Sequence, residues 1–204
     1  MSLTNTANDV AAINLKSLNA AGSANAGGTL TFVDVNGFVI NGLQTTDSAV
    51  LTAGAAVTQT GDAILGALAL KGSGSFTLSD SDNEVSALAS EATGNVFVVS
   101  STATSVAAVN PTGIVTGNAD FALTAASITL NASINAGTGR VYLQTTHSAT
   151  GTITQASGKS IVAAGLAIAS VGDVTLTDSG NNVTTFAADM QTANKTLNLS
   201  LIHI

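Results

Sequence analysis

The stretch Phe76–Leu88, FTLSDSDNEVSAL, decides the fold of this 204-residue chain. It consists of a short alternating apolar segment, a bend of Ser, Asp and Asn residues, and a second alternating segment that includes Val85. The same pattern returns at Met1–Ile13, Val96–Val109 and Val174–Phe186. A supersecondary unit repeated along a chain is typical of a solenoid, in which each unit stacks on the next.

A longer period connects the two halves of the chain. Leu43–Ala49, LQTTDSA, returns as Leu143–Ala149, LQTTHSA, at an offset of 100 residues. Phe76–Leu78 returns as Val174–Leu176 at an offset of 98 residues. Because the two offsets differ slightly, we expect insertions and deletions in the turns between strands.

Together the two periods predict an all-β fold, a right-handed parallel β-helix (β-solenoid) with about 20 residues per coil. Apolar positions alternate with a period of two, which indicates strands rather than helices, and β-branched and turn-forming residues dominate. With strands about 4.8 Å apart, roughly ten coils would give a rod on the order of 50 Å long. We interpret residues 1–204 as one continuous segment that contains two diverged repeats of about 98 residues, 1–100 and 101–198.

A tandem of two β-sandwich domains would give the same long period. Sandwich cores are usually built from large side chains, often Trp and Tyr. This chain has 3% aromatic residues and no Trp, and Tyr142 is its single tyrosine. Since a sandwich has no reason to repeat a strand–bend–strand unit within one domain, the solenoid is preferred.

The composition limits the partners of the chain. Charged residues make up 8% of it, and the net charge is −7. The five cationic residues are dispersed along the sequence: Lys16, Lys71, Arg140, Lys159 and Lys195. Nucleic acid is therefore not expected as a partner. The absence of Cys excludes disulfides and thiolate metal sites.

The longest apolar stretches are Ala63–Leu70 and Ile161–Ala169. Both are too short to cross a bilayer. We interpret them as buried strands joined at Gly66 and Gly165, and we expect no membrane insertion.

Both ends of the chain are expected to be cut. Met1 occupies the position that Phe76, Val96 and Val174 hold in the other copies, so the chain begins within a rung. Solenoids normally need polar caps at their ends, and the first residues carry no signal-peptide pattern. The last six residues, Leu199–Ile204, match the translation of a common transposon sequencing adaptor. We interpret residues 199–204 as a non-native tail, with an ordinary terminal strand as the alternative.

The pattern G-(D/N)-V-x-L-x-D-x-x-N-x-V, clearest in Gly172–Val183, resembles the repeats of filamentous-haemagglutinin-like exoproteins. These large bacterial β-helix proteins leave the cell by two-partner secretion or as autotransporter passengers. The resemblance covers most of the chain and rests on repeat pattern, not on a catalytic motif. It implies a shaft segment that is secreted or displayed on the bacterial cell surface. Host glycans or proteins would then bind to regions outside this segment.

Two short motifs look like sites but are interpreted as turns. Asn110–Gly113, NPTG, partly matches the Asn-Pro-Asn-Gly-type motif of the family's secretion domains, but it has Thr in third place and lies in mid-chain. Ser157–Ser160, SGKS, suggests a phosphate-binding loop, which requires a glycine five positions before Gly158. Ile153 stands there instead.

The remaining candidates for chemistry are charged side chains. The acids of the bends, Asp80, Asp82, Glu84 and Asp178, could gather Ca²⁺, but a solvated bend stabilised by Asx side chains explains them better. Arg140 has no acidic residue within ten positions on either side. His147 stands where the first repeat has Asp47, which is typical of a surface position.

The sequence therefore assigns no catalytic, metal-binding or cofactor-binding residue, and no enzymatic activity is expected. It favours a structural function, the shaft of a large secreted bacterial adhesin or exoprotein whose partners are the neighbouring coils of the same longer chain. A carbohydrate-binding or carbohydrate-cleaving β-helix is the alternative, and it would show acids from successive coils in one groove. A trimeric surface adhesin is a third hypothesis, and it would need one apolar, exposed face.

Overall fold

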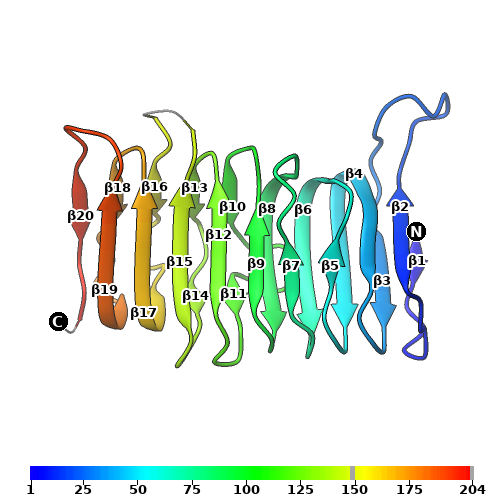
Figure 1. The fold of residues 1–204 in the computed structure, drawn as a ribbon, viewed down its shortest axis with the longest axis horizontal. Coiled ribbons are helices and arrows are strands. Elements are labelled where there is room, and N and C mark those ends of the chain that lie inside the picture. Colours follow the sequence, from blue (N-terminus) through cyan, green and yellow to red (C-terminus); the bar gives the residue numbers. More distant parts are fainter. Residues whose placement is uncertain (148–149, 203–204) are drawn as a thin grey trace.

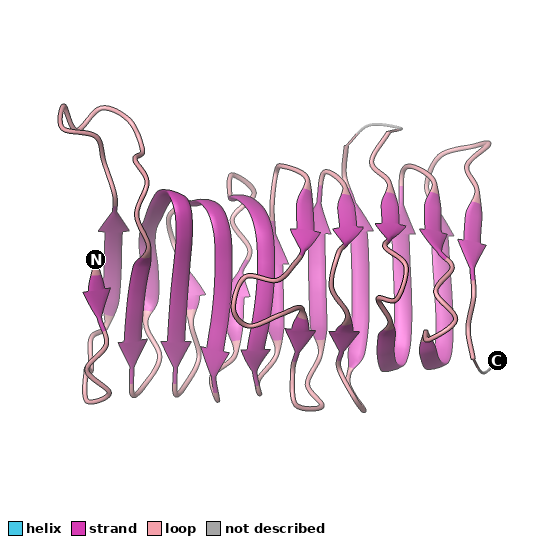
Figure 2. Cartoon of the chain, turned by 180° about the vertical axis from the view of Figure 1, so that it is seen from behind, coloured by secondary structure: helices cyan, strands magenta, loops and turns pink. Residues whose placement is uncertain are grey.

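The computed structural model describes residues 1–147 and 150–202. The chain winds into a parallel β-helix of about eight turns with no helical segment in the described residues. Strands on the near side of Figure 1 run upward, and those nearest the viewer in Figure 2 run downward. Because each turn also advances toward the C-terminal end, the coil is right-handed. The predicted fold class is confirmed.

Short strands joined by corners make up nearly all of the described chain. Their bounds are β1 (Ser2–Leu3), β2 (Ala12–Lys16), β3 (Leu30–Asp34), β4 (Val39–Ala53), β5 (Thr58–Gln59), β6 (Ala63–Gly72), β7 (Phe76–Leu78), β8 (Glu84–Ala92), β9 (Val96–Val99), β10 (Thr104–Val106), β11 (Ile114–Val115), β12 (Phe121–Ala125), β13 (Ile128–Leu130), β14 (Ile134–Asn135), β15 (Arg140–Thr145), β16 (Ile153–Gln155), β17 (Ile161–Ser170), β18 (Val174–Leu176), β19 (Asn182–Met190) and β20 (Leu197–Leu199).

Three columns of inward side chains can be followed through the core from turn to turn. In the first face, successive turns contribute Val57, Phe76, Val96, Phe121, Val141, Leu166 and Phe186. In the second face they contribute Leu30, Ala49, Leu68, Leu88, Val106, Leu130, Gln155, Leu176 and Leu199. A third column begins on the same strands as the second, two residues further along, and continues on β11, β14 and β17; it consists of Phe32, Leu51, Leu70, Ser90, Ile114, Ile134 and Ile161. The period-two alternation of the sequence thus becomes a mainly apolar core with one layer per turn.

The turns are unequal, and several are longer than the sequence predicts. In the first-face column, the step from Val96 to Phe121 is longer than the step from Phe76 to Val96. Part of the excess is a loop at 107–113, between β10 and β11, and a longer one at 17–29 separates β2 from β3. The expectation of roughly ten coils was therefore wrong, and the extra residues lie in connections between strands, as expected.

Each copy of the repeated motif wraps around one corner of the coil. The bend of the Phe76–Leu88 copy separates β7 from β8, and that of the Val174–Phe186 copy separates β18 from β19. The two copies occupy different corners, because β7 pairs with β9 in the first face and β18 pairs with β16 in the second. In the first-face column, Leu166 lies four turns after Phe76. Val174, the counterpart of Phe76 in the long repeat, lies one corner beyond Leu166. The long repeat therefore equals about four and one-third turns.

The two related corners carry the same buried polar cluster, which we call the Gln–Asn clasp. In the first clasp, Asn83 and Gln59 bond side chain to side chain in both directions, and Asn83 Oδ1 also accepts from the N–H of Ala63 at 2.8 Å. Asn181 and Gln155 repeat these bonds, with Ile161 in place of Ala63 at 2.9 Å. Each clasp joins consecutive turns through groups that the core would otherwise leave unpaired.

The apolar stretches around Gly66 and Gly165 are strands, as predicted. They form β6 and β17, each of which continues through a corner without interruption. In residues 1–147 and 150–202, no helix has the length and apolar character that a membrane span requires.

Close stacking of turns requires glycine at Gly74. A Cβ on Gly74 would lie 2.0 Å from the carbonyl oxygen of Ala55 in the preceding turn. We expect Gly74→Ala to lower the free energy of unfolding by about 2–3 kcal/mol, because the backbone of one turn must move. Gly27→Ala is the control, since its nearest neighbour is a side-chain oxygen, Asp47 Oδ2 at 3.0 Å, and not backbone. Urea denaturation of both variants checks this, and equal losses would contradict it.

Candidate functional site

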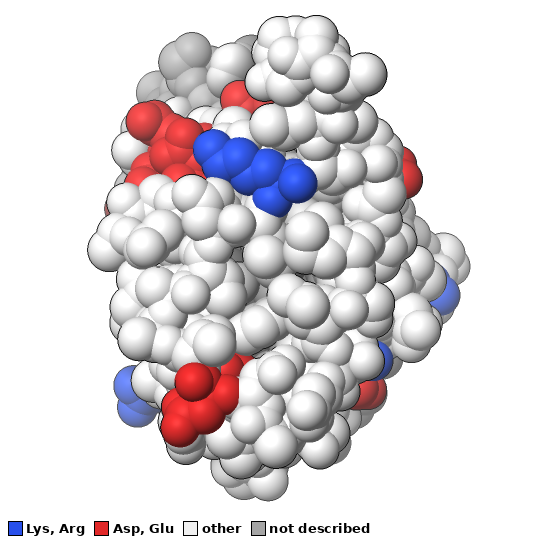
Figure 3. Space-filling model, turned by 90° about the vertical axis from the view of Figure 1, so that its right-hand side faces the viewer, with Lys and Arg blue, Asp and Glu red and all other residues white. Residues whose placement is uncertain are grey.

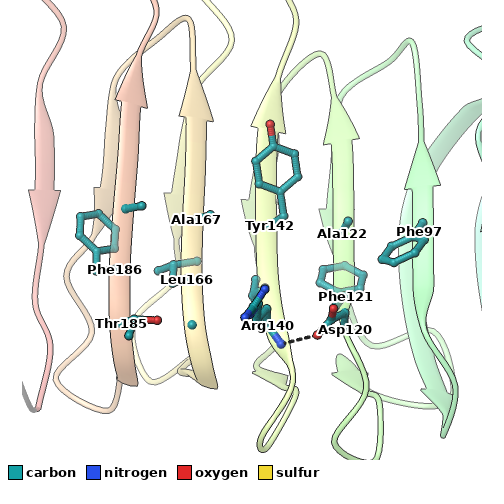
Figure 4. A pocket seen from close by; sticks show the side chains of 13 residues that line it. Phe97, Asp120, Phe121, Ala122, Arg140, Tyr142, Leu166, Ala167, Thr185 and Phe186 are labelled. Atoms are coloured by element: carbon teal, nitrogen blue, oxygen red, sulfur yellow. Dashed lines mark hydrogen bonds between the residues drawn. The ribbon is translucent and has the colours of Figure 1, made fainter.

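An open groove with a volume of about 290 Å³ lies on the outer side of the first face. It crosses β9, β12, β15, β17 and β19, shown from close by in Figure 4. Because side chains alternate along a strand, the residues next to the core column point outward and line the groove. This outward row consists of Phe97, Ala122, Tyr142, Ala167 and Ala187.

The groove results from the alternation of large and small side chains in this row. Phe97 is 36% exposed, and Tyr142 is half-buried. Ala122 lies in the turn between them, and Ala167 and Ala187 continue the row beyond Tyr142. The two rings therefore lie two turns apart, or about 10 Å at the usual spacing of strands. Methyl groups form the floor between and beside them.

Polar side chains flank the apolar row on both sides. On one side lie Asp120, Arg140 and Thr185, of which Asp120 Oδ1 accepts from the backbone N–H of Arg140 at 2.8 Å (Figure 4). Beyond the lining on the other side, two residues after Ala122 and Tyr142, the hydroxyl of Thr124 donates to Gln144 Oε1 at 3.4 Å. The groove thus has an apolar strip between two rows of hydrogen-bonding groups.

Arg140 gives this groove a cationic group in an acidic chain. Within residues 1–147 and 150–202 a single ion pair forms, from Lys71 Nζ to Glu91 Oε1 at 3.1 Å. The guanidinium of Arg140 therefore has no carboxylate partner among these residues. Charged groups are also sparse on the N-terminal end of the rod, which Figure 3 shows. One carboxyl group outside the groove has a shifted pKa. The backbone N–H and the hydroxyl of Thr196 both donate to Asp173, and these bonds, aided by the charge of Lys195, hold the pKa of Asp173 below its usual value.

The sequence motifs that resembled sites are turns in the structure. In Ser157–Ser160, the backbone N–H of Gly158 donates to Asp178 Oδ2 at 2.6 Å, so a carboxylate of the protein already fills the place of an anion. Asn110–Gly113 lies in the loop between β10 and β11, where the N–H of Gly113 donates to the carbonyl of Ala107 at 2.9 Å.

The carboxylates of Asp80 and Asp178 in the bends accept hydrogen bonds from backbone N–H groups. Asp80 Oδ1 accepts from the N–H of Asp82 at 3.0 Å, and Asp178 Oδ1 accepts from the N–H of Gly180 at 2.9 Å. These are the Asx bends that the sequence predicts. Within residues 1–147 and 150–202, no three His, Asp or Glu side chains converge as metal ligands would. His147 is exposed just beyond the end of β15.

Sequence reasoning missed the groove because its residues lie one turn apart. Asp120 and Arg140 are distant in sequence and become neighbours only when β12 pairs with β15. A search for acids within ten positions of Arg140 could not find this contact. The usable signal was the spacing of the strand repeats, which predicts side-by-side placement of residues that are one repeat apart.

Comparison with known proteins does not identify a relative. The chain matches no protein-family model, and neither a curated protein nor a solved structure is significantly similar to it. The function must therefore be argued from the geometry.

Proposed function

We propose that this chain is a shaft segment of a larger secreted bacterial surface protein, an adhesin or exoprotein, and that its task is structural. The observation that carries this proposal is the unbroken stacking of the three core columns, in which each turn pairs with the turns before and after it. Such a rod can hold a distant binding region away from the cell, and its stability grows by nearest-neighbour terms.

The surface supports the same function. The chain carries 8% charged residues, and polar uncharged side chains and backbone carbonyls satisfy one another in the corners. The carbohydrate-cleaving alternative requires acids from successive turns in one groove. The groove of the first face has a single described acid, Asp120, in its lining. The stacking of the turns and the single acid in the groove therefore favour a structural rod over a hydrolytic cleft.

A shaft should accept extra length. The segment 121–140 makes up one complete turn, since Phe121 pairs with Val141 and Leu123 with Leu143. We expect insertion of a second copy of 121–140 after Arg140 to lengthen the rod by about 4.8 Å and to raise the melting temperature.

Small-angle X-ray scattering and thermal denaturation of the two chains measure these effects. The control inserts the same segment, with its sequence shuffled, at the same position. A duplicated-turn chain that is shorter than expected, or that melts no higher than the parent, would contradict the shaft proposal.

A further inference from the structure

We propose that the groove of the first face binds a neutral linear glycan of pyranose rings, laid along the rod axis across β9 to β19. This adds a ligand site to a segment for which the structural proposal requires none.

The shape suits a chain of flat rings. Phe97 and Tyr142 stand on the same row with Ala122 between them, so the groove runs parallel to the rod axis. Their separation of two turns, about 10 Å, allows two non-adjacent sugar rings to pack on the two aromatic rings. Ala167 and Ala187 leave room for the chain to continue beyond Tyr142.

The chemistry suits a sugar better than a wholly apolar ligand. A pyranose has C–H groups on its faces and hydroxyl groups around its edge. The groove matches both features, because its apolar strip lies between hydrogen-bonding groups on either side. Asp120 and Arg140 line one edge. Thr124 and Gln144 lie beyond the lining at the other edge, two residues after Ala122 and Tyr142 on the same strands. Small-molecule sites generally combine an apolar lining with a few placed polar groups in this way.

The balance of positive and negative charge at the edge of the groove indicates a neutral ligand. Arg140 and Asp120 stand side by side in adjacent turns and bring one charge of each sign to the same edge. Asp120 Oδ1 is held by the N–H of Arg140 at 2.8 Å, which fixes the carboxylate at the rim. Together they can accept from and donate to hydroxyl groups without favouring an anion.

The test measures binding of cellohexaose, xylohexaose, mannohexaose and chitohexaose to the full chain by isothermal titration calorimetry. At least one hexasaccharide should bind, and Tyr142→Ala should weaken that binding at least about tenfold, as expected for truncation of a central aromatic anchor. Phe97→Ala should weaken it less, since Phe97 lies at the end of the row.

Thr77→Ala is the matched control, because Thr77 occupies the same outward row one turn before Phe97 and outside the groove. It should leave the affinity unchanged. Melting curves of all variants should coincide with the parent curve, which separates loss of binding from loss of fold.

Three results would overturn the proposal. No hexasaccharide binds; or binding persists equally in Tyr142→Ala and Phe97→Ala; or light scattering shows a concentration-dependent dimer that Tyr142→Ala abolishes, which would make a second copy of the chain the occupant. None of these results bears on the length and stability test of the shaft.

Discussion

Val85→Asp is expected to remove a large part of the stability of the rod. Val85 is 0% exposed and pairs with Leu65 of the preceding turn, in the corner that the Phe76–Leu88 motif builds. Its backbone N–H donates to Ser100 Oγ at 3.0 Å, and its carbonyl accepts from the hydroxyl of Thr104 at 2.8 Å, so the residue is fixed on both sides. A carboxylate there would be buried without a partner, at a cost of about 3–5 kcal/mol. That is a large part of the stability of an ordinary domain.

Circular dichroism and urea denaturation measure this effect. Val183→Asp should behave in the same way, because Val183 is 2% exposed at the related corner. Asp80→Asn is the control, since the amide oxygen can still accept from the N–H of Asp82, and its effect should stay within about 0.5 kcal/mol. If the Val85 and Asp80 variants unfold at the same urea concentration, the assignment of this corner to the core is wrong.

Asn83→Leu is expected to cost about 3 kcal/mol or more, although leucine is apolar and of similar size. Asn83 is 0% exposed, and its Nδ2 donates to the carbonyls of Leu78 at 3.4 Å and Val99 at 3.1 Å and to Gln59 Oε1 at 3.1 Å. The change removes the side-chain donor of both carbonyls and the acceptor of the Ala63 N–H, and each buried group that loses its partner costs about 1–3 kcal/mol.

A double-mutant cycle isolates the clasp. The pair Gln59→Leu and Asn83→Leu should cost less than the two single changes together, by about 1–2 kcal/mol, because each single change already breaks both side-chain bonds between the two residues. Asn131→Leu serves as the control, since Asn131 is exposed and its side chain donates only to Ser105 Oγ at 2.9 Å. Strict additivity of the two changes would show that the clasp is not a unit.

The repeats were sufficient to predict the fold class, because strand–bend–strand copies with period-two alternation have few other solutions. The sequence did not predict the number of turns, since loops such as 107–113 lengthen individual coils. From the sequence the bends were interpreted as solvated, whereas Asn83 and Asn181, which lie in two of these bends, are both 0% exposed. In a bend rich in Asp and Ser, the one amide that turns inward has no distinctive local pattern.

Contacts between turns were the least predictable feature. Arg140 and Asp120 meet because the turn that joins them has the length that pairs Phe121 with Val141. On the second face, unequal turns stack Ser105, Thr129, Thr154, Thr175 and Asn198 into one outward column. A constant period could not align these residues. Accurate strand boundaries in every turn are needed before surface columns, and hence sites, can be read from such a sequence.

The most direct test of the account is to recover the native DNA that flanks this reading frame. We expect further strand–bend–strand turns on both sides, an export signal upstream, and a transporter gene or translocator domain beyond. A frame that closes within a few tens of residues on both sides, with no export signal, would contradict the assignment to a secreted shaft.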